Sequence, residues 1–146
     1  MLPTVTILGD REAAAYLTGV SARLRDLKPA LDSVVDDVYT FEKRWWATNG
    51  QGTFGRPSNA TLKRDRRGGR DPRFMFVTGG LERAATVRGA KGSRTRVGKQ
   101  QASITVTHPL ARIHEARGRD VQGMPAPWQQ DRYAEKVASY IIDGKV

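Results

Sequence analysis

The sequence lacks cysteine altogether and has only two histidines among its 146 residues. Without thiols the chain has no disulfide framework, no thiolate zinc site and no cysteine nucleophile. The spacing of His108 and His114 places them on different faces of a helix, whereas the zinc-protease motif needs two histidines four residues apart with a glutamate beside the first. The sequence therefore predicts neither a metal site nor a cofactor.

Long hydrophobic runs are missing as well. Met1 to Pro3 lead directly into a short β-branched segment, without the basic start and apolar core of a signal peptide, and no stretch has the length of a membrane span. We therefore expect no membrane partner, and a protein that is made and used without crossing a membrane on its own.

The motifs of common enzymes are incomplete. A P-loop ending at Gly98 and Lys99 would need a glycine in place of Ser93 and a serine or threonine in place of Gln100. No Gly-x-Ser-x-Gly sequence marks a nucleophilic serine. A Ser–His–Asp triad is assembled in space, so spacing alone leaves that alternative open. With no catalytic pattern in the sequence, we expect a protein that is not an enzyme.

Acidic residues are scarce in one part of the chain. Residues 56–99 hold thirteen basic residues against three acidic ones, so this segment carries the whole net charge of +10. A positive field concentrated in one segment predicts a negatively charged neighbour. The residues that we expect to contact this neighbour are Lys63, Arg64, Arg66, Arg67, Arg70, Arg88, Lys91, Arg94, Arg96 and Lys99.

Two kinds of neighbour fit this charge. Lysines and arginines contact nucleic-acid phosphates and release counterions. Aromatic residues that would stack on bases are not interleaved with them, because Phe74 and Phe76 lie in an apolar run typical of a core. Sequence-specific readout is therefore not expected. An acidic protein surface fits the same charge equally well.

The longest pattern in the chain is an apolar stripe at alternating steps of three and four residues, typical of one face of a helix. Pro29 lies inside the stripe and would clash with the preceding turn, so we expect a kink or a two-helix break near Lys28, with the same face turned inward. A coiled-coil seam is the alternative, which the proline disfavours. The stripe comprises Leu17, Val20, Leu24, Leu27, Leu31, Val34, Val38, Phe41 and Trp45.

Short β-branched or apolar runs predict strands at residues 4–8, 86–88 and 102–107. Asp10 is a suitable N-cap for a helix that follows the first strand. Residues 89–98, between the second and third strands, are rich in glycine and arginine and lack a hydrophobic period. They predict a hairpin tip or a mobile arm within about residues 88–100.

Shorter segments complete the prediction. A basic helix is expected at 58–67, a helical or strand-leading segment at 81–83, and a short segment at 110–116. The last helix begins at Pro127, with Gly144 after its end. Its expected inner face comprises Tyr133, Val137, Tyr140 and Ile141. The predicted fold is one α+β domain, residues 1–146, in which a small antiparallel sheet is flanked by a long kinked N-terminal helix, or helix pair, and a C-terminal helix.

Several local patterns follow one another in a characteristic order from the end of the long helix onward. They are an aromatic cluster, a basic helix containing threonine, an apolar run closing with Thr-Gly-x-Leu, a basic hairpin, and an Ala-x-Ile-His turn that ends at a glycine. The aromatic cluster is Phe41 to Trp46, the basic helix Ser58 to Lys63, the apolar run Phe74 to Leu81 and the turn Leu110 to Gly118, and Pro125 to Trp128 follow at the start of the last helix. In this order they resemble the phage virion-morphogenesis and tail-completion (neck) proteins.

The resemblance implies a fold similar to that of tail terminators, with an antiparallel sheet flanked by helices. It assigns Thr78 and Gly79 to a tight turn in which glycine supplies a positive φ or a close backbone approach. It also implies that Leu110, Ile113 and His114 pack the end of the sheet against the first long helix. The residues with an expected structural role are Trp45, Thr78, Gly79, Leu81, Ile113 and His114.

The resemblance further implies a structural virion protein, assembled in the host cytoplasm, that forms a ring at the head–tail junction. Six copies are expected rather than twelve, with connector or stopper proteins and tail-tube proteins as neighbours. The basic segment would meet acidic surfaces, for instance Asp32, Asp36 and Asp37 of an adjacent subunit, and the arm at 89–98 would become ordered on a neighbour. The alternative is a basic accessory protein that binds nucleic acid. Non-specific contact of the basic segment with packaged DNA and contact with a protein surface are both left open.

Overall fold

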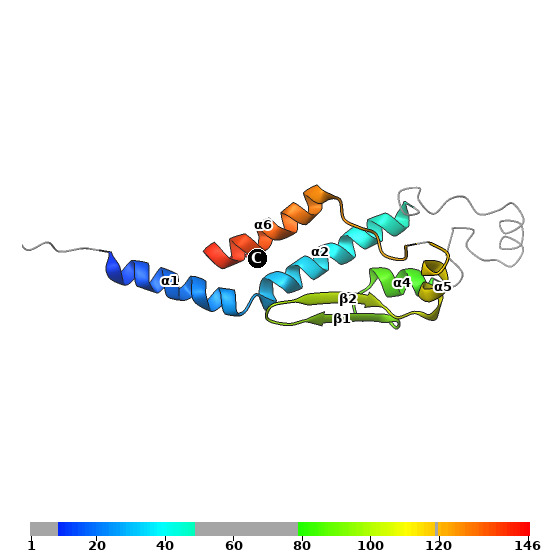
Figure 1. The fold of residues 1–146 in the computed structure, drawn as a ribbon, viewed down its shortest axis with the longest axis horizontal. Helices are drawn as coiled ribbons and strands as arrows, with labels where there is room; N and C mark the ends of the chain where they lie inside the picture. The colour runs from blue at the N-terminus through cyan, green and yellow to red at the C-terminus, as the bar shows by residue number, and fades with distance from the viewer. Residues whose placement is uncertain (1–8, 49–78, 119) are drawn as a thin grey trace, which may run out of the picture.

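The computed structural model describes residues 9–48, 79–118 and 120–146 (Figure 1). Within these ranges the chain is α+β, with helices at the N-terminal side, a two-stranded antiparallel sheet and a C-terminal helix, as predicted. The elements in chain order are α1 (Asp10–Arg25), α2 (Lys28–Ala47), α4 (Gly80–Thr86), β1 (Ser93–Val97), β2 (Ala102–Val106), α5 (Pro109–Glu115) and α6 (Pro127–Asp143). The strand expected at 4–8, the basic helix at 58–67 and Thr78 lie outside the described residues.

The predicted break in the long helix is confirmed. α1 ends at Arg25 and α2 starts at Lys28, with Pro29 in the first turn of α2. A proline is tolerated there because the first N–H groups of a helix have no partner within the helix. The backbone N–H of Lys28 instead donates to the carboxylate of Asp26 over 3.1 Å. The predicted N-cap was wrong by one position, because Gly9 precedes the helix and Asp10 is its first residue.

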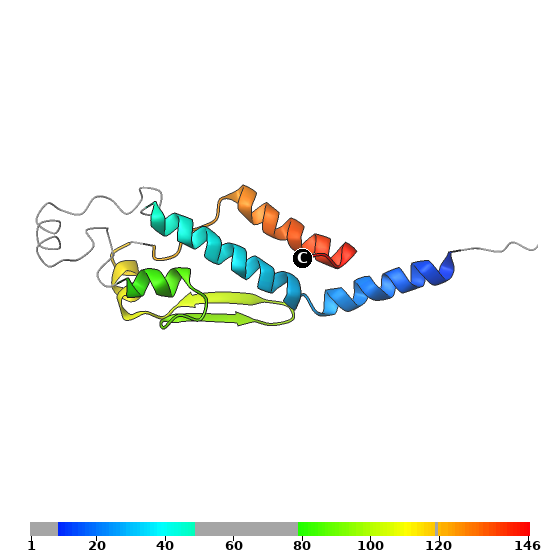
Figure 2. The same cartoon turned by 180° about the vertical axis from the view of Figure 1, so that it is seen from behind.

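The expectation that both halves of the stripe face inward was wrong for α1. This helix projects beyond the rest of the molecule and contacts α6 near its own C-terminal end (Figures 1 and 2). Tyr16 is 52 % exposed, Leu17 63 % and Leu24 48 %. The two-residue link after Arg25 directs α1 away from the core, and α6 is the element against which α1 packs most.

Arg23 fastens α1 to the end of α6. Its guanidinium donates to the carbonyl oxygens of Ile141 and Ile142, over 2.7 and 2.8 Å. These carbonyls belong to the last turn of α6, where helical acceptors have no partner within the helix and favour a cation. Gly144 follows in a left-handed conformation, as predicted for the end of this helix.

The core gathers around the second half of α2. Its largest members, Phe41, Trp45 and Trp46, pack with Leu81 and Ala85 of α4. The indole N–H of Trp46 donates to the carbonyl of Val121, in the segment after α5, over 3.2 Å. The rings of Trp45 and Trp46 meet edge to face, with their centroids 6.2 Å apart. The remaining members are Ala111 and Val121, with Val106 and Leu110 partly buried against them.

α2 lies between two layers, with the sheet, α4 and α5 on one side and α6 on the other (Figures 1 and 2). Its buried residues besides the aromatic core include Val35, Tyr39 and Glu42, each one position beyond a member of the predicted stripe. α6 has no fully buried residue, and its predicted inner residues are half-buried. The stripe residues Val34 and Val38 of α2 are likewise half-buried. α2 therefore has one fully buried face and a second, half-buried face, instead of the single inward face that was predicted.

The sheet is a hairpin whose first strand was not predicted as such. β1 and β2 pair antiparallel, with Ser93 opposite Val106 and Val97 opposite Ala102. Residues 89–98, expected as a tip or an arm, therefore contain a strand, and the connection lies at 98–101. The strand expected at 86–88 was wrong, because Thr86 ends α4, whose Leu81 and Ala85 pack on α2 at helical spacing.

None of the helices in the described part of the chain has the length and apolar character needed to cross a membrane.

The close approach of Gly123 to α2 gives a test of the core. A Cβ at this position would lie 2.8 Å from Cγ of Trp45 and 2.9 Å from Cε1 of Phe41. We predict that Gly123→Ala lowers the free energy of unfolding by about 1–3 kcal/mol, because the aromatic rings must shift to admit a methyl group. The measurement is chemical denaturation followed by tryptophan fluorescence.

Gly98→Ala is the matched control. A Cβ there would meet a carbonyl oxygen at an ordinary 3.5 Å. We expect a change of no more than about 1 kcal/mol, in the stabilising direction if the unfolded chain loses entropy. Equal destabilisation by both substitutions would show that the packing at Gly123 has no special importance.

Candidate functional site: the basic hairpin and its surroundings

Of the ten basic residues expected to contact a partner, five lie in the described part of the chain, and all five belong to the hairpin or its approaches. These are Arg88, Lys91, Arg94, Arg96 and Lys99. The other five, Lys63, Arg64, Arg66, Arg67 and Arg70, lie outside the described residues.

The hairpin has a polar outer face and a more apolar inner face. Arg94 and Arg96 of β1 are exposed, and their cross-strand partners, Thr105 and Ser103, are exposed beside them. Directly paired residues of an antiparallel sheet share a face, so these four side chains form one outward surface. We call these four residues the hairpin face. The alternate residues, which include Val97, Ile104 and Val106, are half-buried toward α2.

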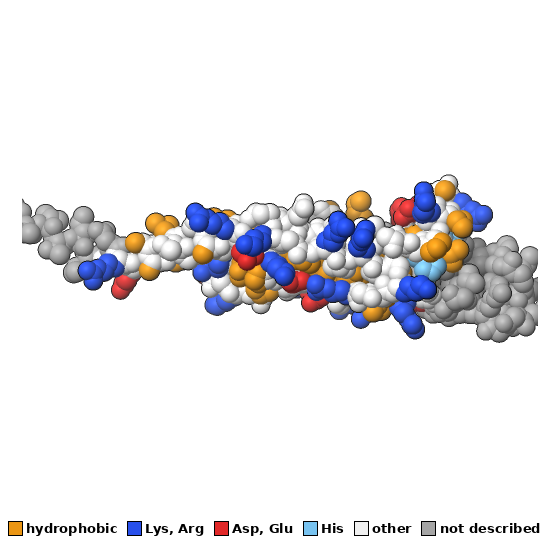
Figure 3. Space-filling model, turned by 90° about the horizontal axis from the view of Figure 1, so that it is seen from below, with side chains coloured by type: hydrophobic (Ala, Val, Ile, Leu, Met, Phe, Trp, Pro, Cys, Tyr) orange, Lys and Arg blue, Asp and Glu red, His pale blue; other side chains and the backbone are white. Residues whose placement is uncertain are grey.

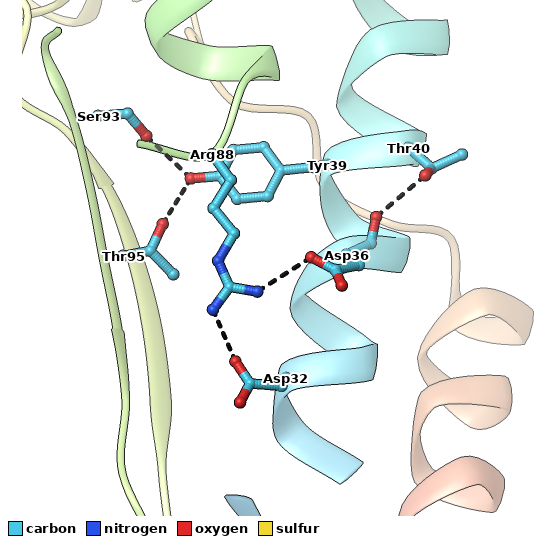
Figure 4. A network of polar contacts seen from close by, with 7 residues as sticks. All are labelled: Asp32, Asp36, Tyr39, Thr40, Arg88, Ser93 and Thr95. Carbon is cyan, nitrogen blue, oxygen red and sulfur yellow. Dashed lines mark hydrogen bonds and ion pairs between the residues drawn. The ribbon is translucent and has the colours of Figure 1, made fainter. Parts of the chain in front are cut away.

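The inner side of the hairpin is held by Tyr39 of α2 (Figure 4). The hydroxyl of Tyr39 forms hydrogen bonds with Oγ of Ser93 at 2.8 Å and with Oγ1 of Thr95 at 2.6 Å. One phenol thus contacts two alternate residues of β1, which fixes both the distance and the register of the strand relative to α2.

The tip of the hairpin is attached to the junction of α1 and α2. The backbone N–H of Leu27 donates to the carbonyl of Lys99 over 2.8 Å, and Nε2 of Gln100 donates to the carbonyl of Leu24 over 2.8 Å. With Tyr39 at one end and these two bonds at the other, the hairpin is held along its length. Its outer side chains are therefore presented on a fixed backbone.

Arg88 does not belong to the hairpin face. It binds Asp32 over 2.6 Å and Asp36 over 3.0 Å, both on α2 (Figure 4). The hydrogen bonds that Arg88 donates to Asp32 and, with a smaller effect, to Asp36 raise the pKa of Arg88 above its ordinary value. Such half-exposed pairs each contribute only about 0–1 kcal/mol, but they neutralise this cation within its own chain.

Asp37, the third member of the expected acidic docking surface, also has a partner within the chain. Its carboxylate binds Nζ of Lys136 on α6 over 2.6 Å. The three aspartates of α2 therefore face two ways, because Asp32 and Asp36 bind the segment before the hairpin whereas Asp37 binds the opposite layer. The structure places cations of the same chain on all three residues that were expected to receive a neighbour's basic segment.

The residues with an expected structural role differ in their burial. Trp45 and Leu81 are buried in the core, and Gly79 is the N-cap of α4, with the positive φ of 72° that was one of its two expected roles. His114 is half-buried, but Ile113 is 47 % exposed, so its expected packing role was wrong. The reason is helical geometry, because Ile113 follows the buried Ala111 by two residues, about 200° around the helix.

Glu42 is a buried charged residue that the sequence patterns did not single out. It is 2 % exposed on the core side of α2 and accepts a hydrogen bond from the backbone N–H of Gly123 over 3.2 Å. Burial raises the pKa of Glu42 to about 7, and the bond from Gly123 offsets part of this rise. Its spacing from Tyr39 and Trp46, three and four residues, was the signal that could have found it.

A groove of about 620 Å³ lies between α2 and α6. Its walls include the aromatic residues Phe41, Trp128 and Tyr133 together with four basic side chains, and no histidine lines it. Burial, with smaller effects from Asp37 and Glu42, raises the pKa of Tyr133 above its ordinary value. Across the described residues, no group of three histidine, aspartate or glutamate side chains is placed to hold a metal ion.

Comparison with protein-family models, with curated proteins and with solved structures found no match to this chain. The resemblance to phage neck proteins therefore stays a prediction from the order of the sequence motifs.

The buried carboxyl of Glu42 predicts a pH dependence of stability. The unfolded chain ionises near the ordinary pKa of 4.5 whereas the folded chain keeps the proton until about 7, so this residue makes stability fall as the pH rises through that interval. The difference corresponds to roughly 3 kcal/mol. Glu42→Gln should match the wild type near pH 4.5 and exceed it at pH 8, as measured by denaturation at both values. A constant difference across the pH range would contradict this prediction.

Tyr39→Phe tests the attachment of the hairpin to α2. We expect a loss of about 1–3 kcal/mol in the free energy of unfolding, because two half-buried hydroxyls lose a partner. Amide hydrogen exchange should accelerate in β1 more than in α6. Tyr16→Phe on the exposed part of α1 is the control, with an expected change within about 0.5 kcal/mol.

Proposed function

We propose that this chain is a structural subunit of a tailed-phage particle that assembles into a ring at the head–tail junction. The order of the sequence motifs supports the phage class, and the exposed apolar stripe of α1 supports assembly. Connector or stopper proteins on one side and tail-tube proteins on the other are the proposed neighbours of the ring.

The stripe on α1 is the observation that carries the assembly. Tyr16, Leu17 and Leu24 are about half exposed or more, at spacings that place them along one side of the helix. Single exposed apolar residues need no explanation, but a row of them on a projecting helix is typical of a contact surface. Within the described residues, α6 covers this helix only near its C-terminal end.

The position of α1 favours a ring over a two-fold dimer. The helix extends from one end of an elongated molecule, so its stripe can reach a different surface of the next copy (Figures 1 and 2). A contact between two different surfaces is heterologous, and repeated heterologous contacts form a ring when the rotation closes. Six copies are the proposed number, by the resemblance to tail terminators.

The acidic residues of α2 take a smaller part in this proposal than the sequence suggested. Arg88 already neutralises much of the field of Asp32 and Asp36 within the chain. Asp36 is still 67 % exposed and can accept an additional cation from a neighbour. The main contact is therefore placed on α1, with the acidic residues at its margin.

The test is the mass of the purified chain and of a stripe variant. The wild type should have six times the subunit mass of 16.2 kDa in native mass spectrometry. Leu17→Gln with Leu24→Gln should give a folded monomer, because glutamine keeps the helix propensity and the net charge while removing apolar contact area. The far-ultraviolet circular dichroism should be unchanged.

Met124→Gln is the matched control, since Met124 is 86 % exposed outside α1. Its mass should equal that of the wild type. A wild type that stays monomeric, or that stops at a dimer, would overturn the ring. A stripe variant that still forms the ring would show that another surface makes the contact.

The phage assignment has its own test. Particles produced by the genome that encodes the chain should contain it, and labelled antibody should bind at the head–tail junction in electron micrographs. Intact infectious particles formed after deletion of the chain would contradict the assignment.

A further inference from the structure

We infer that the hairpin face binds the phosphate backbone of duplex DNA without sequence preference. The inference goes beyond assembly, because it concerns a surface on the other side of the hairpin from α2 and does not require α1.

The sequence around the hairpin contains no acidic residue that would offset its positive charge. No aspartate or glutamate occurs between Glu82 and Glu115. Asp32 and Asp36 form ion pairs with Arg88, which precedes the hairpin. These two carboxylates therefore neutralise Arg88 and not the basic residues of the hairpin itself. Lys91, Arg94, Arg96 and Lys99 are all exposed, and Figure 3 shows basic side chains spread along the side of the molecule on which the hairpin lies.

The geometry of the hairpin face suits a row of phosphates. Arg94 and Arg96 are alternate residues of one strand, so their Cα atoms are roughly 6.5–7 Å apart and their side chains project in the same direction. Thr105 and Ser103 lie opposite them and add a hydroxyl donor beside each guanidinium. Arginine, serine and threonine are among the side chains that contact phosphate oxygens in protein–DNA complexes.

The composition of the hairpin face favours DNA over an acidic protein. The centre of a protein–protein interface is enriched in aromatic and apolar side chains, whereas the four residues of the hairpin face are all polar. The apolar residues of the strands, such as Ile104 and Val106, turn toward α2. Because no aromatic residue lies on this face, stacking on the bases of a single strand is not available, and the duplex backbone is the preferred ligand.

The hairpin is held before any ligand arrives. Tyr39 fixes the inner side of β1, and the bond from Leu27 fixes the tip. Binding therefore requires ordering of the outer side chains and not of the backbone, which lowers its entropic penalty.

The experiment measures the salt dependence of binding to a short fluorescein-labelled duplex by fluorescence anisotropy. Arg94→Gln with Arg96→Gln is compared with the wild type and with a control in which Arg132→Gln and Lys145→Gln remove two exposed charges from the α6 side. Each phosphate contact contributes a slope of about −0.9 to the plot of log affinity against log salt. The hairpin variant should therefore have a slope less steep by about 2, and an affinity at low salt reduced at least tenfold.

The control should lose much less affinity and keep the wild-type slope, although its net charge falls equally. Equal losses in both variants would overturn the inference, because net charge alone would then explain the binding. Absence of wild-type binding at low salt would also overturn it. If the hairpin variant kept its DNA affinity but no longer formed the ring, the hairpin face would be a contact for an acidic protein surface instead.

Assembly and DNA binding are separated by the α1 variant described above. Leu17→Gln with Leu24→Gln should retain the duplex affinity expected of a single subunit while losing the ring. If no ring forms but the chain still binds the duplex, the DNA-binding inference holds and the assembly proposal fails. If the ring forms but the chain does not bind the duplex, the assembly proposal holds and the DNA-binding inference fails.

Discussion

The arrangement of the described residues depends on the packing of α2 on both of its sides. Near one end of this helix, α4, α5 and the segment around Val121 pack against Phe41, Trp45 and Trp46. About one turn earlier in the helix, Tyr39 forms the hydrogen bonds that attach the hairpin. On the opposite side α6 packs with half-buried residues only. A two-stranded hairpin has little stability alone, so both its order and its position derive from α2.

The same helix decides which charges of the molecule stay uncompensated. Asp32 and Asp36 point toward Arg88 at the start of the hairpin, and Asp37 points toward Lys136 of α6. These pairs join the layers to α2 at exposed positions, where each stabilises the fold only slightly. Their larger effect is on the distribution of charge, because no acidic residue of α2 is bonded to the guanidinium groups of Arg94 and Arg96. The hairpin face is cationic for this reason as well as because of its own sequence.

Periodicity and proline placement predicted the three long helices α1, α2 and α6, whereas the short helices, the hairpin and the buried carboxyl were harder to find. The break at Pro29 and the last helix from Pro127 to Gly144 follow from local backbone chemistry, which sequence reveals directly. β1 was missed as a strand because its inward residues are mostly serine and threonine, whose burial depends on one tyrosine far away in the chain. Glu42 was missed because a glutamate on an apolar face is usually solvated, whereas the fold buries it and brings the backbone N–H of Gly123, distant in sequence, to its carboxylate.

The apolar stripe from Leu17 to Trp45 shows why sequence cannot separate internal from external contacts. The pattern is continuous across Pro29, and each half has the spacing of a buried helical face. The structure buries the second half within the chain and leaves much of the first half exposed on a projecting helix. Hydrophobic burial gains the same free energy per unit area whether the covering surface belongs to the same chain or to another copy. In the proposed assembly, the part of the stripe that the described residues leave exposed, on α1, is therefore the surface on which a second copy packs.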